Sequence, residues 1–295
     1  MEFRPFRIEL ATTFRGVTSR SGVLIRGTGP DGADAWGEYS PFDDYNAERA
    51  SRWWAAAMEA ANGLWPAPVR DHVEVNSIVP EVSPHEAARL AVLGGCRTAK
   101  VKVAGYCSPM EDAARVEAVA AALGPGGKVR VDANGAWDVD DAVRALTELE
   151  MAARGGGLDG LEYVEQPCAT VDEMAQLRRR VDTKIAADES IRIPSDPMEV
   201  VRKQAADIIV LKVAPLGGVR ACLELAERAG LPVVVASAME SSVGLAAGIA
   251  LARALPELNY ACGLGTGALL ATDTVTQTLV PMDGIFGEVN LDVIA

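Results

Sequence analysis

Two lysines two positions apart, Lys100 and Lys102, interrupt the apolar segment AKVKV at residues 99–103. Because side chains alternate between the two faces of a strand, both ammonium groups project to one side. Like charges side by side disfavour protonation of both, and burial acts in the same direction, so one lysine could serve as a base near neutral pH. An isolated KxK is more typical of a surface edge strand whose lysines face water. The rest of the chain must decide between these two interpretations.

Carboxylates end three successive apolar runs further along the chain. Asp132 ends VRVD, Glu165 ends LEYVE, and Asp188 ends IAAD. On adjacent parallel strands, about 4.8 Å apart, such side chains can converge on one point. A hard divalent cation with oxygen ligands would relieve their repulsion, and the lack of an accompanying His or Cys favours Mg²⁺. Each carboxylate alone is more typical of a helix N-cap or a loop, so the metal hypothesis depends on their recurrence.

A further lysine, Lys212, ends the next apolar run, DIIVLK. Lys102 precedes the carboxylates and Lys212 follows them, so the two lysines flank the predicted metal from opposite sides. This arrangement suits removal of a proton next to a carboxylate. The metal would stabilise the negative charge that develops on the carboxylate oxygens while a lysine takes the proton.

Parallel strands alternating with helices are needed to position these residues, and the sequence from Val73 onward has that pattern. The predicted strands are 73–79, 98–103, 128–131, 160–164, 184–187, 207–211, 232–236 and a weaker 258–262. The predicted helices are 84–93, 111–123, 139–150, 171–180, 197–203, 219–229 and 242–254. This rhythm predicts a closed parallel barrel. A doubly wound open sheet stays possible, although no GxGxxG follows the first strand.

The chain ends differ from this repeating part. The first ~70 residues predict strands at 3–10, 22–26 and 35–39, then a helix capped by Asn46 and running to about Ala61. The segment WPAP at 65–68 breaks regular structure. We therefore expect an α+β unit at 1–70, a barrel at 71–267, and a segment at 268–295 that returns to the first unit through a strand at 284–294.

Composition narrows the function classes. The formal charge is −13, from 28 basic and 41 acidic residues, so binding to nucleic acid or to an anionic membrane is not expected. No leader pattern is present and no apolar run reaches the ~18 residues of a membrane span, which favours a cytoplasmic protein. The 5 cysteines lack CxxC pairs, so neither a disulfide framework nor a zinc site is predicted.

Taken in chain order, the motifs KVK, VRVDANGAW, EYVEQP, ADES and LKV resemble those of the enolase superfamily, specifically its muconate-lactonizing-enzyme subgroup. The resemblance covers the whole chain. It implies an α/β fold, a modified (β/α)7β TIM-type barrel with a small α+β capping domain. It also implies roles for individual residues. Asp132, Glu165 and Asp188 would be the Mg²⁺ ligands, Lys102 the base and Lys212 the opposite lysine. Lys100 would tune Lys102, and Asn134 and Glu189 would lie just outside the metal ligands.

The reaction expected within the subgroup is indicated by where this sequence differs from one group of its members and where it resembles another. Dipeptide epimerases of the subgroup carry Asp-x-Asp near the last barrel strand, where this chain reads CGLGTG, so that activity is disfavoured. The reduced cap, the compact tail and the segment ASAMESS at 236–242 look like those of o-succinylbenzoate synthases, lyases of menaquinone biosynthesis. The resemblance implies a small anionic carboxylate substrate. A racemase of N-acylamino acids, a muconate cycloisomerase and a noncatalytic metabolite-binding barrel stay open as alternatives.

The substrate carboxylates are expected to contact the seventh-strand serines Ser237, Ser241 and Ser242. Arg20, in a predicted cap loop from Arg15 to Gly22, is a further candidate, although a solvated turn explains that loop equally well. The sequence does not determine the oligomeric state.

Overall fold

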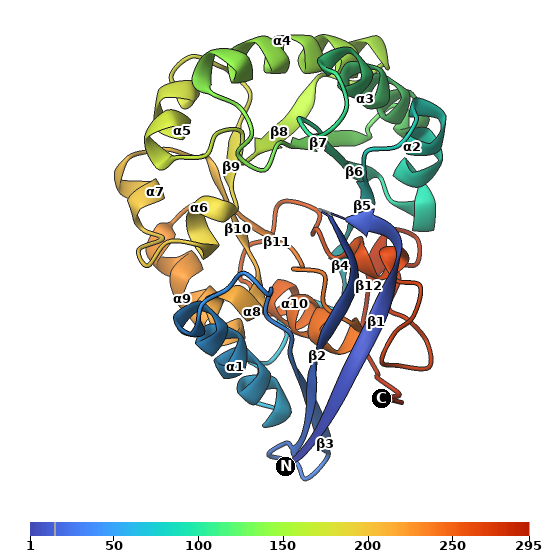
Figure 1. Cartoon of the computed structure of the whole chain (residues 1–295), viewed down its shortest axis with the longest axis vertical. Helices are drawn as coiled ribbons and strands as arrows, with labels where there is room; N and C mark the ends of the chain where they lie inside the picture. The colour runs from blue at the N-terminus through green and yellow to red at the C-terminus, as the bar shows by residue number, and fades with distance from the viewer. Residues whose placement is uncertain (15, 295) are drawn as a thin grey trace.

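The cap is built from the N-terminal part of the chain. The computed structural model describes residues 1–14 and 16–294 (Figure 1). Strands β1 (Glu2–Phe14), β2 (Val17–Thr28) and β3 (Asp34–Tyr39) form an antiparallel sheet in that order. Helix α1 (Ala47–Ala61) begins after Asn46, whose side chain accepts a hydrogen bond from the Arg49 amide at 3.0 Å. These elements confirm the predicted strands and helix, with a longer hairpin than expected.

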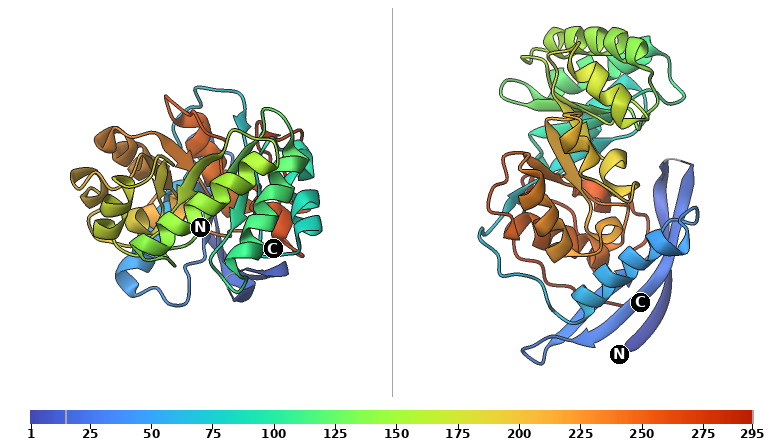
Figure 2. Two further views of the ribbon diagram at one scale, coloured as in Figure 1. Left: turned by 90° about the horizontal axis from the view of Figure 1, so that it is seen from above. Right: turned by 90° about the vertical axis from the view of Figure 1, so that its left-hand side faces the viewer.

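Small residues allow α1 to lie directly on the cap sheet. Ala57 and Ala61 of α1 pack against Ile25 of β2. A Cβ atom at Gly37 of β3 would lie 1.9 Å from the carbonyl oxygen of Ala57, so a larger residue there would push the helix away. Figure 2 shows α1 between the cap sheet and the barrel, where it contacts α8 (Val213–Leu216).

The barrel sheet is parallel, in the order β11-β10-β9-β8-β7-β6-β5. Its strands are β5 (Asn76–Val79), β6 (Thr98–Lys102), β7 (Lys128–Asp132), β8 (Leu161–Glu165), β9 (Ile185–Ala187), β10 (Ile208–Leu211) and β11 (Val233–Val235). Between β11 and β5, the segment at residues 262–263 joins the two edges of the sheet: the Asn76 amide of β5 donates to the Cys262 carbonyl at 2.9 Å, and the Gly263 amide donates to the Val235 carbonyl of β11 at 2.8 Å. The predicted strand 258–262 is reduced to these bridges, because the glycine-rich segment turns at once into the 3₁₀ helix η2 (Gly265–Leu269).

Helices follow the strands and cover the outside of the sheet (Figure 1). Besides α8, they are α2 (Pro84–Ala91), η1 (Leu93–Gly95), α3 (Pro109–Leu123), α4 (Val139–Gly155), α5 (Val171–Arg178), α6 (Glu189–Arg192), α7 (Glu199–Arg202), α9 (Val219–Ala229) and α10 (Ser242–Ala254). The short helices α6 and α8 come directly after β9 and β10 and were not expected. Both begin beside a predicted site residue, Asp188 and Lys212.

The C-terminal segment contacts both parts of the molecule. Strand β12 (Ile285–Phe286) pairs antiparallel with β4 (Val73–Glu74), which precedes the barrel sheet. The prediction that a strand at 284–294 pairs with the N-terminal unit is therefore wrong in its partner. The segment reaches the cap elsewhere. Near its start the Ala271 amide donates to the Glu9 carbonyl of β1 at 2.8 Å, and Leu291 and Val293 pack against a cluster that includes Phe6 and Ile8.

Within the described residues, no helix is both long and apolar enough to cross a membrane. The cysteines are free thiols, with Cys107 partly exposed and the others buried.

Candidate active site

The predicted lysines and carboxylates meet at the C-terminal ends of neighbouring barrel strands. Lys102 on β6 lies opposite Asp132 on β7, which lies opposite Glu165 on β8. Asp188 and Lys212 directly follow β9 and β10. Because strand register fixes these positions, the backbone alone places five charged side chains at one end of the barrel.

On one side of the site, the two lysines of β6 share a carboxylate. Lys102 Nζ lies 2.5 Å and Lys100 Nζ 3.1 Å from Asp132 Oδ2. Lys100 Nζ also lies 2.7 Å from Glu165 Oε1, and Lys102 Nζ donates to Asn134 Oδ1 at 2.8 Å. Neither lysine side chain is more than 11% exposed, so these contacts lie in a largely dry environment.

The opposite side is built around Asp188. Lys212 Nζ lies 2.7 Å from Asp188 Oδ2, and Arg192 Nε lies 3.0 Å from Asp188 Oδ1. The Arg192 guanidinium also contacts Glu189 Oε1 at 2.7 Å, and Glu189 accepts a hydrogen bond from Asn134 Nδ2 at 3.3 Å. Asn134 and Glu189 thus link the two sides of the site.

The two lysines of β6 differ in their electrostatics. Burial lowers the pKa of Lys102, and neighbouring Lys100 adds to this effect, while Asp132 opposes it. Burial also disfavours the charged form of Lys100, but Glu165 and Asp132 outweigh it and raise the pKa of Lys100. The two environments therefore move the pKa values of these neighbouring amines in opposite directions.

The carboxylates also differ from one another. Burial opposes their ionisation, but the adjacent lysines outweigh it and lower the pKa of Asp132, and Lys212 with Arg192 does the same for Asp188. Burial raises the pKa of Glu165 to about 7, although Lys100 acts against it. Glu165 is the carboxylate that most lacks compensating charge.

The donor set fits a hard cation by its chemistry, because three buried carboxylates on adjacent strands offer only oxygen atoms. Each of them here faces ammonium or guanidinium groups. As the side chains stand, the described residues include no group of three Asp, Glu, His or Cys close enough to hold a metal ion. Metal ligation by Asp132, Glu165 and Asp188 therefore stays a prediction.

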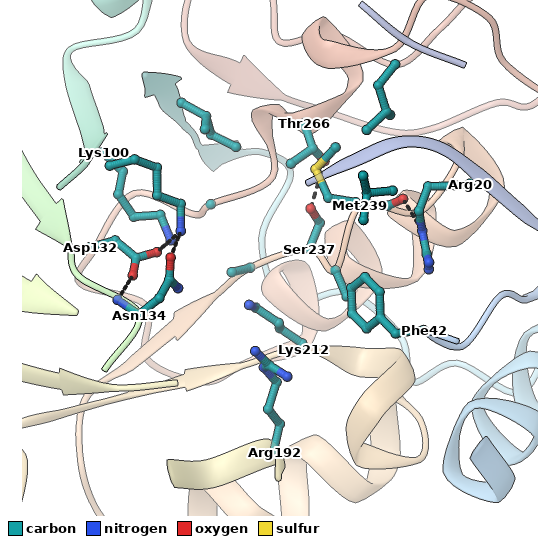
Figure 3. Close-up of a pocket in the computed structure, with 17 residues that line it drawn as sticks. Arg20, Phe42, Lys100, Asp132, Asn134, Arg192, Lys212, Ser237, Met239 and Thr266 are labelled. Carbon is teal, nitrogen blue, oxygen red and sulfur yellow. Dashed lines mark hydrogen bonds and ion pairs between the residues drawn. The ribbon is translucent and has the colours of Figure 1, made fainter. Parts of the chain in front are cut away.

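A pocket lies between these charged groups and the cap (Figure 3). Lys100 and Asp132 lie on one side, Arg192 and Lys212 on another. The cap contributes apolar side chains and one arginine to the lining: Leu10, Val17, Arg20 and Phe42. The pocket thus has a charged barrel wall and a largely apolar cap wall.

Arg20 reaches this pocket from a strand. The predicted loop from Arg15 to Gly22 is instead part of β2 from Val17 onward, and Arg15 lies outside the described residues. The Arg20 guanidinium lies 4.3 Å from the centre of the Phe42 ring, and its Nε donates to the Met239 carbonyl at 3.3 Å. Its Nη2 donates to the Ser40 carbonyl.

The three predicted serines have different surroundings. Ser237 lines the pocket, and its hydroxyl lies 2.7 Å from that of Thr266. Ser241 and Ser242 do not line it. The hydroxyl of Ser241 donates to Glu38 Oε2 of the cap at 2.5 Å, and that of Ser242 to Asp273 Oδ2 at 2.5 Å. Ser241 is the N-cap of α10, so the helix start turns both serines toward the junction of barrel and cap.

Arg192 was missed from the sequence, although it lines the pocket and donates to the Tyr45 hydroxyl at 2.5 Å. A signal was present, because Arg192 follows Asp188 by four residues, the spacing of an ion pair on one helix face. Helix α6 has only four residues, too few for the sequence to show a helical periodicity.

A barrel with these charged strand ends under an antiparallel cap defines the class of protein. Residues 84–288 match the family model "Enolase C-terminal domain-like" and residues 6–61 match "Enolase N-terminal domain-like". The chain belongs to the enolase superfamily, and the predicted fold class is confirmed.

Its relatives within the superfamily are more specific. The chain is 58% identical over 294 residues to an o-succinylbenzoate synthase of Thermobifida fusca (strain YX), covering 99% of this chain and 89% of that protein. It is 50% identical over 280 residues to the o-succinylbenzoate synthase of Mycolicibacterium smegmatis, covering 94% and 82%. Among solved structures, the L-Ala-D/L-Glu epimerase of Bacillus subtilis shares the fold, with a TM-score of 0.82 at 24% identity, covering 99% of this chain and 96% of that one.

Proposed function

We propose that this protein is an o-succinylbenzoate synthase. The similarity to enzymes of that name over nearly the whole chain carries the proposal, and it does not favour the racemase, cycloisomerase or noncatalytic alternatives. The reaction is the syn dehydration of 2-succinyl-6-hydroxy-2,4-cyclohexadiene-1-carboxylate to o-succinylbenzoate and water, a step of menaquinone biosynthesis. The substrate is a small anion with two carboxylates, which suits a pocket lined by Lys100, Lys102, Arg192 and Lys212.

Lys102 is the base in this mechanism. Its neutral amine removes the proton from the ring carbon that bears the carboxylate, and the resulting ammonium then donates that proton to the departing hydroxide on the same face. Burial and the neighbouring charge of Lys100 favour the neutral amine. Asn134, which accepts from Lys102 Nζ at 2.8 Å, orients the amine.

Mg²⁺ is the cofactor that the donor set suits. Asp132, Glu165 and Asp188 would hold it, and when bound it supplies positive charge to the substrate carboxylate as that group gains electron density. Lys100, with its raised pKa, stays protonated and keeps one charge beside Glu165 and Asp132. Positive charge therefore remains at this wall throughout the reaction.

Lys212 approaches the substrate from the other side of the site. It stabilises the negative charge spread over the ring, as an ammonium does above a π system. It transfers no proton in a syn elimination, which leaves Lys102 to act in both steps. Racemisation, in contrast, would require proton transfer by both lysines.

The cap wall and the adjacent barrel residue Ser237 hold the succinyl arm. Arg20 provides charge for the distal carboxylate, the Ser237 hydroxyl provides a hydrogen bond, and Phe42 with Leu10 excludes water. The substrate class, the cofactor and the expected cytoplasmic location are proposals for this chain.

The decisive experiment follows the absorbance change as the cyclohexadiene becomes aromatic, with and without Mg²⁺. The purified protein should form o-succinylbenzoate with Mg²⁺ and lose this activity after exhaustive EDTA treatment. In D₂O, an N-succinyl amino acid should exchange its α-proton slowly or not at all. Rapid racemisation without dehydration would overturn the proposal in favour of a racemase.

A further inference from the structure

A buried ion pair lies on helix α3, behind the strand that carries Lys102. Asp112 and Arg115 are three residues apart on α3 and contact each other, and they are 4% and 1% exposed. Burying two charges is expensive unless other hydrogen bonds compensate. On helix α4 the Asp141–Arg144 pair has the same spacing, but those side chains are 53% and 68% exposed. The α3 pair therefore requires an explanation that a surface pair does not.

Both members of the α3 pair bind backbone next to Lys102. Arg115 Nη2 donates to the carbonyl of Lys102 at 3.1 Å, and the amide of Ala104 donates to Asp112 Oδ2 at 2.8 Å. Strand β6 ends at Lys102, so these two backbone groups lie where strand pairing stops. The pair supplies their hydrogen bonds from the helix side.

The backbone at this point is held in an uncommon conformation. Ala104 has a φ of 62°, in the left-handed region that a residue with a Cβ adopts rarely. On the side that faces β7, the Val103 amide donates to the Asp132 carbonyl at 3.1 Å. The segment 102–104 is thus fixed by β7 on one side and by α3 on the other.

We propose that Asp112 and Arg115 are positioning residues for Lys102. They hold the backbone on either side of the Lys102 side chain, so that the amine of Lys102 approaches the substrate carbon from a fixed position and direction. This inference rests on the proposed function, in which Lys102 is the base. A base must lie within hydrogen-bond reach of its proton, and a displacement of about 1 Å can reduce the rate about 10²-fold.

The test compares Arg115→Met with wild type in kcat, KM and the isotope effect for substrate deuterated at the carbon that loses its proton. We expect kcat to fall about 10- to 100-fold, KM to change little, and the isotope effect to increase, because proton removal becomes slower relative to the other steps. A merely structural role would lower the fraction of folded enzyme, and neither the isotope effect nor the rate per folded molecule would change. Arg144→Met on α4 is the matched control and should resemble wild type.

Conservative variants extend the test in case Arg115→Met folds poorly. Asp112→Asn keeps an oxygen that can accept from Ala104, whereas Asp112→Leu does not, so the Asn variant should retain the higher kcat and the smaller isotope effect. The double variant Asp112→Asn/Arg115→Met removes both buried charges and should still show the low kcat. Wild-type isotope effects and rates per folded molecule in every folded variant would overturn the proposal. Failure of the proposed function would differ, since wild type itself would form no o-succinylbenzoate or Lys102→Ala would stay active.

Discussion

The two walls of the pocket are built in different ways. The barrel wall consists of charged side chains at strand ends, where Lys102, Asp132 and Glu165 lie opposite one another in adjacent strands. The cap wall consists of N-terminal side chains far in sequence from the barrel, and Arg20 of β2 is held across the domain boundary by the carbonyl of Met239. Backbone pairing therefore fixes the first wall, and docking of one domain on another fixes the second. In the proposed mechanism the barrel wall carries out proton transfer, and the cap wall recognises the succinyl arm of the substrate.

The largest effect is expected from removing the base of the barrel wall. Lys102→Ala should lower kcat by about 10⁴-fold. Lys102 acts first as the base and then as the acid, and general acid–base catalysis contributes up to about this factor. The unfolding midpoint should change little. Steady-state rates and circular dichroism check both points, with the exposed Lys128→Ala as control. Dehydration at a rate near wild type would exclude Lys102 as the base.

A carboxylate of the same wall comes next. Asp188→Asn should lower kcat by about 10²- to 10³-fold, because the metal's contribution of several kcal/mol depends on its ligands. Mg²⁺ should raise the melting temperature of wild type by binding the native state, and this increase should be lost in the variant. Asp172→Asn, at an exposed carboxylate paired with Lys203, is the control. An undiminished Mg²⁺ effect in Asp188→Asn would show that the ion binds elsewhere.

The cap wall should respond in KM instead of kcat. Arg20→Met removes a charged hydrogen-bond donor worth about 1.5–3 kcal/mol, so KM should increase about 10- to 100-fold while kcat stays within a few fold. Arg26→Met, on the same strand but pointing to exposed carboxylates, should leave both constants near wild type. A loss confined to kcat would place Arg20 in the chemistry and remove the contrast between the walls.

This contrast also explains how much the sequence could predict. Alternation along strands and the order of βα units suffice to bring Lys100, Lys102, Asp132 and Glu165 together, because the barrel leaves their positions little freedom. Arg20 was only a candidate, since its place depends on how the cap docks. Ser241 was expected beside Ser237 in the pocket, but it caps α10 and turns toward Glu38. The side-chain direction of Ser241 is therefore set by its hydrogen bonds at the helix start and not by its closeness in sequence to Ser237.

The last expected effect is on stability and not on turnover, and it concerns the junction that holds the two walls together. Glu38 of the cap accepts hydrogen bonds from Ser241 Oγ and from the Gly244 amide at 3.0 Å, so its carboxylate satisfies the start of α10. A second buried carboxylate, Glu240, accepts from the Ala238 amide at 2.6 Å. Burial, together with neighbouring Glu38, raises the pKa of Glu240 to about 7, although its hydrogen bonds and Arg20 act against this.

The ionisation of Glu240 should make the stability of the protein depend on pH. Because the folded pKa of Glu240 lies above its unfolded value of about 4.5, the native chain binds the extra proton between these values, and stability falls as pH increases from about 4.5 to about 7. The loss is as much as about 3 kcal/mol and levels off above that range. Glu240→Gln should remove this part of the slope, so that urea unfolding at pH 5 and pH 8 gives more similar free energies than in wild type, with exposed Glu257→Gln as control. A slope as steep in Glu240→Gln as in wild type would assign the pH dependence to another group and leave the junction without a titrating carboxyl.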